Sequence, residues 1–322
     1  MSKIYFPGAN TGCGFVSKFC GIVPPDEKTH YTYVLKGGPG VGKNTLMKTV
    51  AERARKKNMS VEEFRCASDP KSLDAIRIPN IRTVILDGTS PHCIDPAVPG
   101  ICDEVIDLGH FKNKSEFAKR RAELDTLFSE NRKCYKKAYA LLGAARILKE
   151  HTLEAVVETL DLEKTRSFLS NVIKSAKDGR ARELFISSAT PDGIVDFSES
   201  FSGENTVYLS GTVGEAMLFS ASEMLCGKSV TLGFDFVLPT SIRAVAGDDF
   251  SIIVKKDEAP DASLPPYVYC FSKESARLAG LAAEALTDAR NAHNKIEEIY
   301  RPYVDYTRVN AECEKLLAEL NV

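Results

Sequence analysis

Short apolar runs and stretches with helical spacing alternate along the first part of the chain. The runs predict strands at residues 31–36, 60–66, 82–87 and 104–108. Directly after the first of these strands, the spacing of apolar residues predicts a loop and a helix over residues 40–57. Strands that alternate with a helix in this way predict an α/β fold with a mostly parallel sheet.

The pattern becomes helical over the middle of the chain and then returns to strands. One broad apolar face predicts a long helix from Lys114 to Glu150, and a second helical stretch runs from Leu153 to Ser175. The polar segment Lys177–Arg180 follows as a boundary, and helical extensions are predicted from Glu274 to Leu320. Between them, strands are predicted at residues 206–210, 229–237, 250–255 and 267–271, with a helix at 214–226.

The two strand-rich regions resemble each other in sequence. The segment Phe6–Val16 can be laid over Phe185–Val195 without a gap, and phenylalanine, threonine, glycine and valine coincide. Further matches keep one constant spacing, namely Ser60 with Ser229, Pro70 with Pro239, Ser72 with Ser241 and Ala75 with Ala244. These matches predict a duplicated domain, with copies over residues 1–183 and 184–322. Chance resemblance between two α/β segments is the alternative.

The composition is that of an ordinary globular protein and narrows the classes of function. The 322 residues include 42 Lys and Arg against 44 Asp and Glu, so bulk charge gives no reason to expect a nucleic-acid partner. We expect no secretory signal and no membrane span, because no apolar stretch approaches ~18 residues. The 9 cysteines, an odd number without a C-x-x-C pair, favour a reduced, cytoplasmic protein.

A glycine-rich segment after the first predicted strand fits the phosphate-binding pattern G-x-x-x-x-G-K-[S/T]. Glycines let consecutive backbone N–H groups turn toward a polyphosphate, and the N-terminus of the next helix adds positive potential. Lys43 supplies the lysine, whereas Asn44 stands where the pattern has a hydroxyl for Mg²⁺. A glycine-rich turn without a ligand is the alternative. The predicted nucleotide-binding residues are Gly37, Gly38, Pro39, Gly40, Val41, Gly42, Lys43, Asn44 and Thr45.

Further candidate residues lie near the ends of the predicted strands. The strand at residues 82–87 ends in Asp87, where phosphate-loop proteins carry the carboxylate that holds Mg²⁺, although turns also favour aspartate. Beyond it, His92 could orient water or sense a γ-phosphate and Asp95 could be a base, although both lie in a turn-rich stretch. Asp69 could contact a phosphate acceptor. The predicted metal ligands are Asn44 and Asp87, and the predicted catalytic residues are Lys43, Asp87 and His92.

The matching loop in the second region is shortened and has lost its lysine. In the segment Val207–Leu218, Glu215 takes the place of Lys43 and would repel phosphate. The alignment also puts Lys256 at the position of Asp87. The second copy is therefore expected to keep the fold without binding a nucleotide.

Several of these segments resemble those of a known family. They are residues 6–15, 37–45 and 64–69, and above all residues 87–92 with Asp95 and Pro96. The chain resembles a family of bacterial P-loop proteins described only as uncharacterised ATPases or ATP-binding proteins, built from two tandem copies of one domain. The resemblance implies a duplicated P-loop NTPase fold of three α/β/α layers and ATP as the nucleotide. The chain departs from the family at Asn44 and in the second loop, since members typically have both loops intact.

These residues lead to three hypotheses for function. The first is an ATP-binding protein that hydrolyses ATP with Mg²⁺ in its first domain only. The second is a nucleotide-responsive binding module without significant hydrolysis, motivated by Asn44 and the loss of the second site. The third is a small-molecule or nucleotide kinase with Asp69 or Asp95 at the acceptor. Besides the nucleoside triphosphate, each involves a protein or small-molecule partner that the sequence does not identify.

Overall fold

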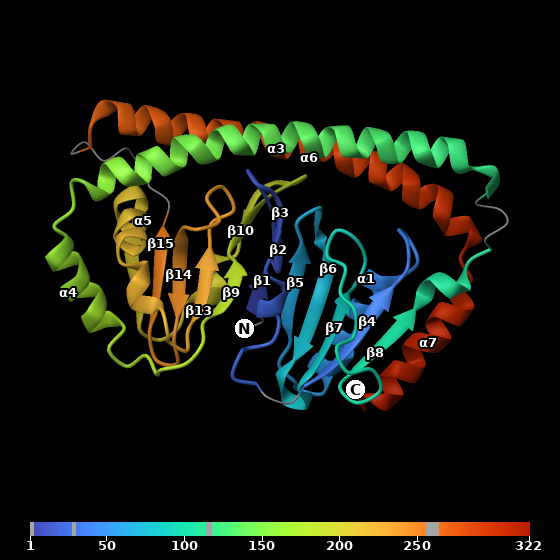
Figure 1. Ribbon diagram of the computed structural model, residues 1–322. Coiled ribbons are helices and arrows are strands. Elements are labelled where there is room, and N and C mark those ends of the chain that lie inside the picture. Colours follow the sequence, from blue (N-terminus) through green and yellow to red (C-terminus); the bar gives the residue numbers. More distant parts are fainter. Residues whose placement is uncertain (1–2, 28–29, 114–117, 256–263) are drawn as a thin grey trace.

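The chain forms two β-sheets with a pair of long helices across them. The computed structural model describes residues 3–27, 30–113, 118–255 and 264–322. The two sheets lie side by side, and the helices run antiparallel to each other over one end of both sheets (Figure 1). The protein is thus an α/β protein with mixed sheets. Within the described ranges, no helix has both the length and the apolar character needed to cross a bilayer.

The first sheet has 6 strands in the order β1-β5-β6-β7-β4-β8. Their bounds are β1 (Lys3–Tyr5), β4 (Tyr31–Lys36), β5 (Glu62–Cys66), β6 (Asp69–Ile78), β7 (Thr83–Asp87) and β8 (Asp103–Asp107). Strand β6 runs antiparallel to both of its neighbours, and the other pairs are parallel. The four strands predicted in this part of the chain are confirmed, and strands β1 and β6 are additional ones.

Strand β6 was not predicted from the sequence because it contains charged residues that are buried in the structure. Asp74 and Arg77 interrupt its apolar positions, yet their side chains are only 4% and 6% exposed. Charged residues are rarely so deeply buried unless a partner compensates them. Arg77 has one, because its guanidinium lies 3.0 Å from the carboxylate of Glu62.

The second sheet has 5 strands in the order β12-β15-β14-β13-β9. Their bounds are β9 (Arg182–Phe185), β12 (Thr206–Ser210), β13 (Thr231–Phe234), β14 (Ile242–Ala246) and β15 (Ser251–Lys255). Strand β14 runs antiparallel to both of its neighbours, and the other pairs are parallel. The chain therefore visits corresponding places in the two sheets in the same order, and β8 has no counterpart in the described part of the second sheet.

Helices cover the faces and one end of the sheets. Their bounds are α1 (Lys43–Lys56), α3 (Arg121–Val157), α4 (Leu162–Val172), α5 (Gly211–Ser220), α6 (Pro266–Tyr300) and α7 (Tyr306–Glu319). Short 3₁₀ helices are η1 (Phe19–Gly21), η2 (Pro79–Ile81), η3 (Leu108–Phe111), η4 (Ser198–Phe201), η5 (Ser222–Leu225) and η6 (Arg301–Tyr303). The predicted start of the first long helix, residues 114–117, lies outside the described residues. The predicted helix at 153–175 is in fact the end of α3 followed by α4.

The strand predicted at residues 267–271 is wrong, because this segment is the start of helix α6. Pro266 opens the helix, and its fixed φ suits the first helical turn. Val268 is fully buried in a small cluster with Leu153 and Val156 of α3. Packing against α3 therefore outweighs the alternation of aromatic and apolar residues that suggested a strand.

Two short hairpins of the same design each follow the first strand of a sheet in the chain. They consist of β2 (Gly8–Thr11) with β3 (Gly14–Ser17) and of β10 (Ser187–Thr190) with β11 (Gly193–Asp196). The hydroxyl of Thr11 donates to the Gly14 carbonyl at 2.7 Å, and Thr190 does the same to Gly193 at 2.8 Å. Gly14 and Gly193 have φ values of 92° and 98°, which glycine adopts without strain. The matching residues of these segments therefore shape the turns.

The two halves of the chain share part of their core. Phe6 and Phe185 form an antiparallel bridge between the halves. One face of the first sheet contributes to a buried cluster with residues of the second half, which contains Tyr5, Val34, Phe64, Ala75, Leu86, Leu184, Phe201, Ala244 and Ile253. Helices α1 and α7 pack on the other face. The predicted three layers are not met at this sheet, because the second half of the chain takes the place of one helical layer.

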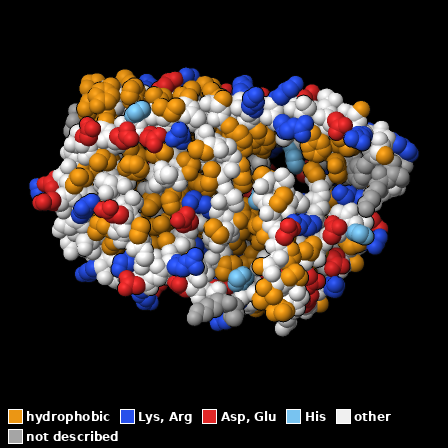
Figure 2. All heavy atoms as spheres, viewed as in Figure 1, with side chains coloured by type: hydrophobic (Ala, Val, Ile, Leu, Met, Phe, Trp, Pro, Cys, Tyr) orange, Lys and Arg blue, Asp and Glu red, His pale blue; other side chains and the backbone are white. Residues whose placement is uncertain are grey.

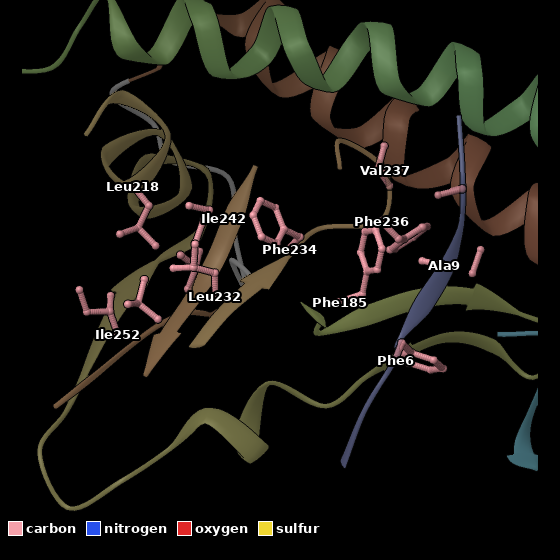
Figure 3. Close-up of a cluster of buried hydrophobic side chains, with 14 of the residues drawn as sticks. Phe6, Ala9, Phe185, Leu218, Leu232, Phe234, Phe236, Val237, Ile242 and Ile252 are labelled. Carbon is pink, nitrogen blue, oxygen red and sulfur yellow. The ribbon is translucent and has the colours of Figure 1, made fainter. Parts of the chain in front are cut away.

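Packing also crosses the predicted boundary between residues 1–183 and 184–322. Helix α7 belongs to the second range by sequence, yet Val309 and Leu316 are buried against the first sheet. A cluster on the second sheet extends toward the middle of the molecule (Figure 3). Its members include Phe6, Ala9, Phe185, Leu218, Leu232, Phe234, Phe236, Val237, Ile242 and Ile252. The two sequence halves therefore form one packed structure.

Candidate functional site

The predicted phosphate loop connects the end of β4 to the start of α1. Gly37, Gly40 and Gly42 have φ values of 145°, 70° and 101°, in a left-handed region that other residues rarely adopt. Gly42 is the N-cap residue of α1 and has no side chain to cap the helix. The first N–H groups of α1 and its positive end are therefore suited to an anion.

Lys43 lies in the concave side of this loop. Its Nζ donates to the carbonyl of Gly37 at 2.5 Å and to that of Gly38 at 3.2 Å. The same atom lies 3.5 Å from Oδ2 of Asp87, and the two side chains are 11% and 16% exposed. The structure thus brings together the lysine and the carboxylate that were predicted to act with a nucleotide.

Asp87 ends strand β7, next to the strand that carries the loop. The parallel register pairs it with Leu35 near the end of β4. Its Oδ1 accepts hydrogen bonds from the backbone N–H of Thr89 at 2.9 Å and from the Thr89 hydroxyl at 2.6 Å. These two bonds fix the carboxylate, so that Oδ2 is the oxygen on the side of Lys43.

A second carboxylate, that of Asp74, is buried beside Asp87. Burial raises the pKa of Asp74 to about 7; the charge of Asp87 adds to this increase, and a hydrogen bond with the Cys66 thiol opposes it. Oδ2 of Asp74 has no hydrogen-bond partner among the described residues. Sequence reasoning missed Asp74. The available signal was a single carboxylate within the otherwise apolar segment 73–76.

His92 is buried at the same place. Its ring stacks on Phe19 with centroids 4.4 Å apart, and its Nε2 lies 4.0 Å from Oδ1 of Asp74. Burial lowers the pKa of His92 to about 4, and the positive charge of Lys43 contributes to the decrease. The imidazole is therefore neutral near pH 7. Among the described residues, neither ring nitrogen has a hydrogen-bond partner.

Asn44 is directed toward strand β6. Its Oδ1 accepts a hydrogen bond from the backbone N–H of Leu73 at 3.1 Å. This bond links the first turn of α1 to the residue that precedes Asp74. Thr45, the next candidate for a hydroxyl ligand, is exposed. The role of Asn44 as a metal ligand stays a prediction, and its observed contact is with the backbone of β6.

The two candidate acceptor residues lie toward the surface. The side chain of Asp95 is 86% exposed and lies 3.0 Å from Nζ of Lys36. Asp69 begins β6, where its Oδ2 accepts from the Ser72 hydroxyl at 2.6 Å and its Oδ1 lies 3.4 Å from Arg290. These contacts tie both carboxylates to neighbouring side chains of the scaffold.

The end of α6 and the start of α7 cover the loop, and we call residues 297–309 the α6–α7 elbow. The Tyr306 hydroxyl donates to the Gly40 carbonyl at 2.7 Å. A Cβ atom added at Gly38 would meet the Tyr300 ring at 3.1 Å, and one at Gly42 would meet Val309 at 3.1 Å. Glycine is thus needed here for close approach as well as for conformation. Figure 2 shows a hollow below the long helices, on the half of the molecule that carries the first sheet.

The corresponding place in the second half holds a buried ion network. Nζ of Lys149, from α3, lies 2.9 Å from both Glu215 and Asp235. Arg243 lies 3.3 Å from Asp196 and 3.7 Å from Asp235. A cavity of about 320 Å³ beside the start of α5 is lined by Lys149, Glu215, Asp235 and Arg243. Glu215, which the sequence comparison aligned with Lys43, therefore has its charge balanced by residues of the protein itself.

Strand register corrects one position of the sequence alignment. Lys256 lies outside the described residues. In the first sheet Asp87 pairs with Leu35, and in the second sheet Val254 pairs with Leu209 at the corresponding place. The β6–β7 hairpin is longer than the β14–β15 hairpin, which shifts the alignment here. An apolar side chain therefore stands where the first half has Asp87.

The residues present fit a magnesium nucleotide better than a metal ion alone. Across the described residues, no three His, Cys, Asp or Glu side chains are grouped to hold a metal ion. Mg²⁺ is commonly bound through one or two carboxylates together with phosphate oxygens, and the unpartnered oxygen of Asp74 is available for such a contact. The chain matches no protein-family model, no curated protein and no solved structure.

Proposed function

We propose that this protein binds ATP with Mg²⁺ at the loop of residues 37–43 and hydrolyses it in this half only. The observation that carries the proposal is the position of Lys43 between the loop carbonyls and Asp87. A glycine loop, a helix N-terminus, a lysine and a strand-end carboxylate together provide what a triphosphate and its cation need. Bound Mg²⁺ would neutralise charge on the phosphate oxygens.

Each side chain has a distinct role in this proposal. Lys43 leaves the loop carbonyls and pairs with the β- and γ-phosphates, while the backbone N–H groups surround the anion. Asp87 holds the cation. His92, neutral and buried, accepts a hydrogen bond from the attacking water and orients it. The α6–α7 elbow supports the loop from its outer side through the Gly40 carbonyl.

We infer further that the fold is a duplicated P-loop domain. The inference is supported by the residues that lie side by side on successive strands, which form one row across each sheet. In the first sheet the row is Tyr5, Phe64, Ala75, Leu86 and Val34, and in the second it is Leu184, Gly233, Ala244, Ile253 and Tyr208. Ala75 and Ala244, which the sequence comparison also matched, occupy the same place in their rows.

The variant Lys43→Ala tests the proposed function. Loss of a charged hydrogen bond to phosphate costs about 2 kcal/mol, so we expect ATP affinity to fall by about thirtyfold and phosphate release to stop. Calorimetric titration with ATP and Mg²⁺ measures the first, and a phosphate-release assay measures the second. The control is Lys56→Ala, in the last turn of the same helix, which should behave as wild type. Wild-type affinity in Lys43→Ala would refute the site.

One observation favours a nucleotide-responsive binding module as the second candidate. The Asn44 side chain is bonded to the backbone of β6 and provides no hydroxyl for Mg²⁺. The same experiment separates the two functions. Lys43-dependent ATP binding without phosphate release by the wild-type protein would support the binding module over the ATPase.

A further inference from the structure

We propose that Asp74 is the second protein ligand of the nucleotide-bound Mg²⁺, in place of the hydroxyl that position 44 lacks. This inference rests on the proposed ATP site and specifies how that site holds its cation. It assigns a metal-binding role to a residue of strand β6, which lies outside the phosphate loop.

Strand register places the two carboxylates together. The antiparallel pairing of β6 and β7 matches Ala75 with Leu86 and Ile76 with Ile85. The next position along this ladder brings Asp74 opposite Asp87, and directly opposed residues have Cβ atoms about 5 Å apart on one face of the sheet. This is the face covered by α1, since Ile76 and Ile85 pack there. The carboxylates therefore lie beside Lys43, the first residue of that helix.

Without a metal ion, this arrangement leaves the Asp74 carboxylate poorly compensated, because the ammonium of Lys43 lies against Asp87. Two carboxylates face each other in a site where Asp74 is 4% exposed and His92 is 8% exposed. Oδ2 of Asp74 and both ring nitrogens of His92 lack partners among the described residues. Buried polar atoms without partners destabilise a fold unless a ligand satisfies them. A hard divalent cation bound to a triphosphate would be coordinated by oxygen atoms of both carboxylates.

Asn44 contributes indirectly to the same site. Its hydrogen bond to the N–H of Leu73 fixes the β6 backbone one residue before Asp74. A serine or threonine at residue 44 would be a metal ligand itself. The asparagine instead holds in place the strand that carries the carboxylate ligand. Asn44 is a positioning residue in this proposal.

The second half of the chain shows that these positions change together. The constant spacing that matches Ala75 with Ala244 places Arg243 at the position of Asp74. Strand register places Val254 at the position of Asp87, and Glu215 stands for Lys43. Both carboxylates are absent from the half that has lost the lysine, and a guanidinium occupies the place of Asp74. This is expected if Asp74 and Asp87 act on the same cation.

Titration of ATP binding with and without Mg²⁺ tests the proposal. For the wild-type chain, we expect Mg²⁺ to tighten ATP binding by at least tenfold over binding in EDTA. For Asp74→Asn, this enhancement should fall to twofold or less, while affinity in EDTA stays the same or improves because a negative charge is removed. Asp107→Asn, at the exposed end of strand β8, which pairs with β4, is the matched control and should keep the full enhancement.

The outcomes distinguish this proposal from the proposed function. A full Mg²⁺ enhancement in Asp74→Asn would overturn the role of Asp74 while leaving the ATP site in place. Failure of the wild-type chain to bind ATP in either condition would refute both. A second variant separates ligation from folding: Asp74→Cys should lose the enhancement by Mg²⁺ and regain it with Cd²⁺, because a thiolate prefers the softer cation. No rescue by Cd²⁺ in a folded Asp74→Cys chain would count against direct ligation.

Discussion

At the scale of single residues, the site contains two neighbouring side chains, Asp74 and His92, whose pKa values are shifted in opposite directions. Burial raises the pKa of Asp74 to about 7 and lowers that of His92 to about 4. Both groups are therefore more readily neutral than they would be in water, although they lie beside the charges of Lys43 and Asp87. Strongly displaced pKa values in a cleft are typical of functional sites, and these two belong to neighbouring side chains.

The raised pKa of Asp74 predicts how stability depends on pH. Between pH about 4 and about 7 the folded state holds a proton on Asp74 that the unfolded chain releases, so this group makes the protein less stable as pH rises through that window. Asp74→Asn removes the effect. We expect the Tm of the variant relative to wild type to increase by about 5 °C from pH 4.5 to pH 8. The raised pKa corresponds to about 3 kcal/mol over this window, and about 1 kcal/mol changes the Tm of a chain of 322 residues by roughly 1.5 °C.

Scanning calorimetry at a series of pH values measures this difference. His92 contributes the opposite dependence. Between pH about 6.5 and about 4 its imidazole is protonated in the unfolded chain but stays neutral in the folded state, so its contribution to stability decreases as pH falls. That contribution is common to both proteins and largely cancels when they are compared. A Tm difference that is the same at every pH would show that Asp74 does not titrate in this range.

At the scale of elements, the hydrophobic pattern predicted four of the six strands of the first sheet. It predicted β4, β5, β7 and β8, together with the loop and α1. It missed β6 because the two buried charges of that strand resemble a polar segment. Asp74 lies beside Asp87 because of the register between β6 and β7. This register cannot be inferred from the sequence of either strand alone. Sequence reasoning could therefore find Lys43, Asp87 and His92 but not the carboxylate between them.

The α6–α7 elbow is the second feature that local pattern could not reveal. Its contact with the loop joins Tyr306 and Gly40, which are 266 positions apart. Helical periodicity predicts that such helices exist, but the place where they pack depends on the whole fold. The alternating aromatic residues at the start of α6 were misread for the same reason, since contact with α3 decides their conformation.

The contact between the elbow and the loop leads to a prediction for Tyr306→Phe. The Tyr306 hydroxyl binds the Gly40 carbonyl, which keeps this carbonyl away from the phosphates of the proposed nucleotide. Loss of one such bond costs about 1 kcal/mol, so ATP affinity should fall by about fivefold with little change in Tm. Calorimetric titration checks the affinity. Tyr267→Phe, at the opposite end of α6, is the control, and an equal loss there would contradict the prediction.

At the scale of the whole molecule, the two halves are held together by a shared core and by a buried ion pair. Arg182 of β9 lies 2.9 Å from Glu62 of β5, and its Nε donates to the carbonyl of Gly21 at 2.6 Å. Arg77 pairs with the same carboxylate. This network joins segments of both halves at a place that is almost fully buried.

Removal of Arg182 should therefore destabilise the entire protein. Arg182→Ala leaves Glu62 with one buried partner and leaves the Gly21 carbonyl without its donor, and breaking such a pair costs about 3 kcal/mol. Because the halves share a core, we expect one cooperative unfolding transition whose midpoint lies at a lower urea concentration than that of the wild type. Circular dichroism during a urea titration measures this midpoint. Lys177→Ala, whose partner Asp248 is exposed, should have little effect. Two separate transitions in Arg182→Ala would argue against a shared core.

The position of helix α7 on the first sheet has a consequence for synthesis of the protein. Residues 37–43 leave the ribosome early, but the segment that supports them from outside follows only after residue 300. A chain interrupted before the elbow would contain every residue of the phosphate loop and both sheets, yet the loop would lack its outer support. Competence to hold a nucleotide would in this way report that nearly the whole of this chain has been made.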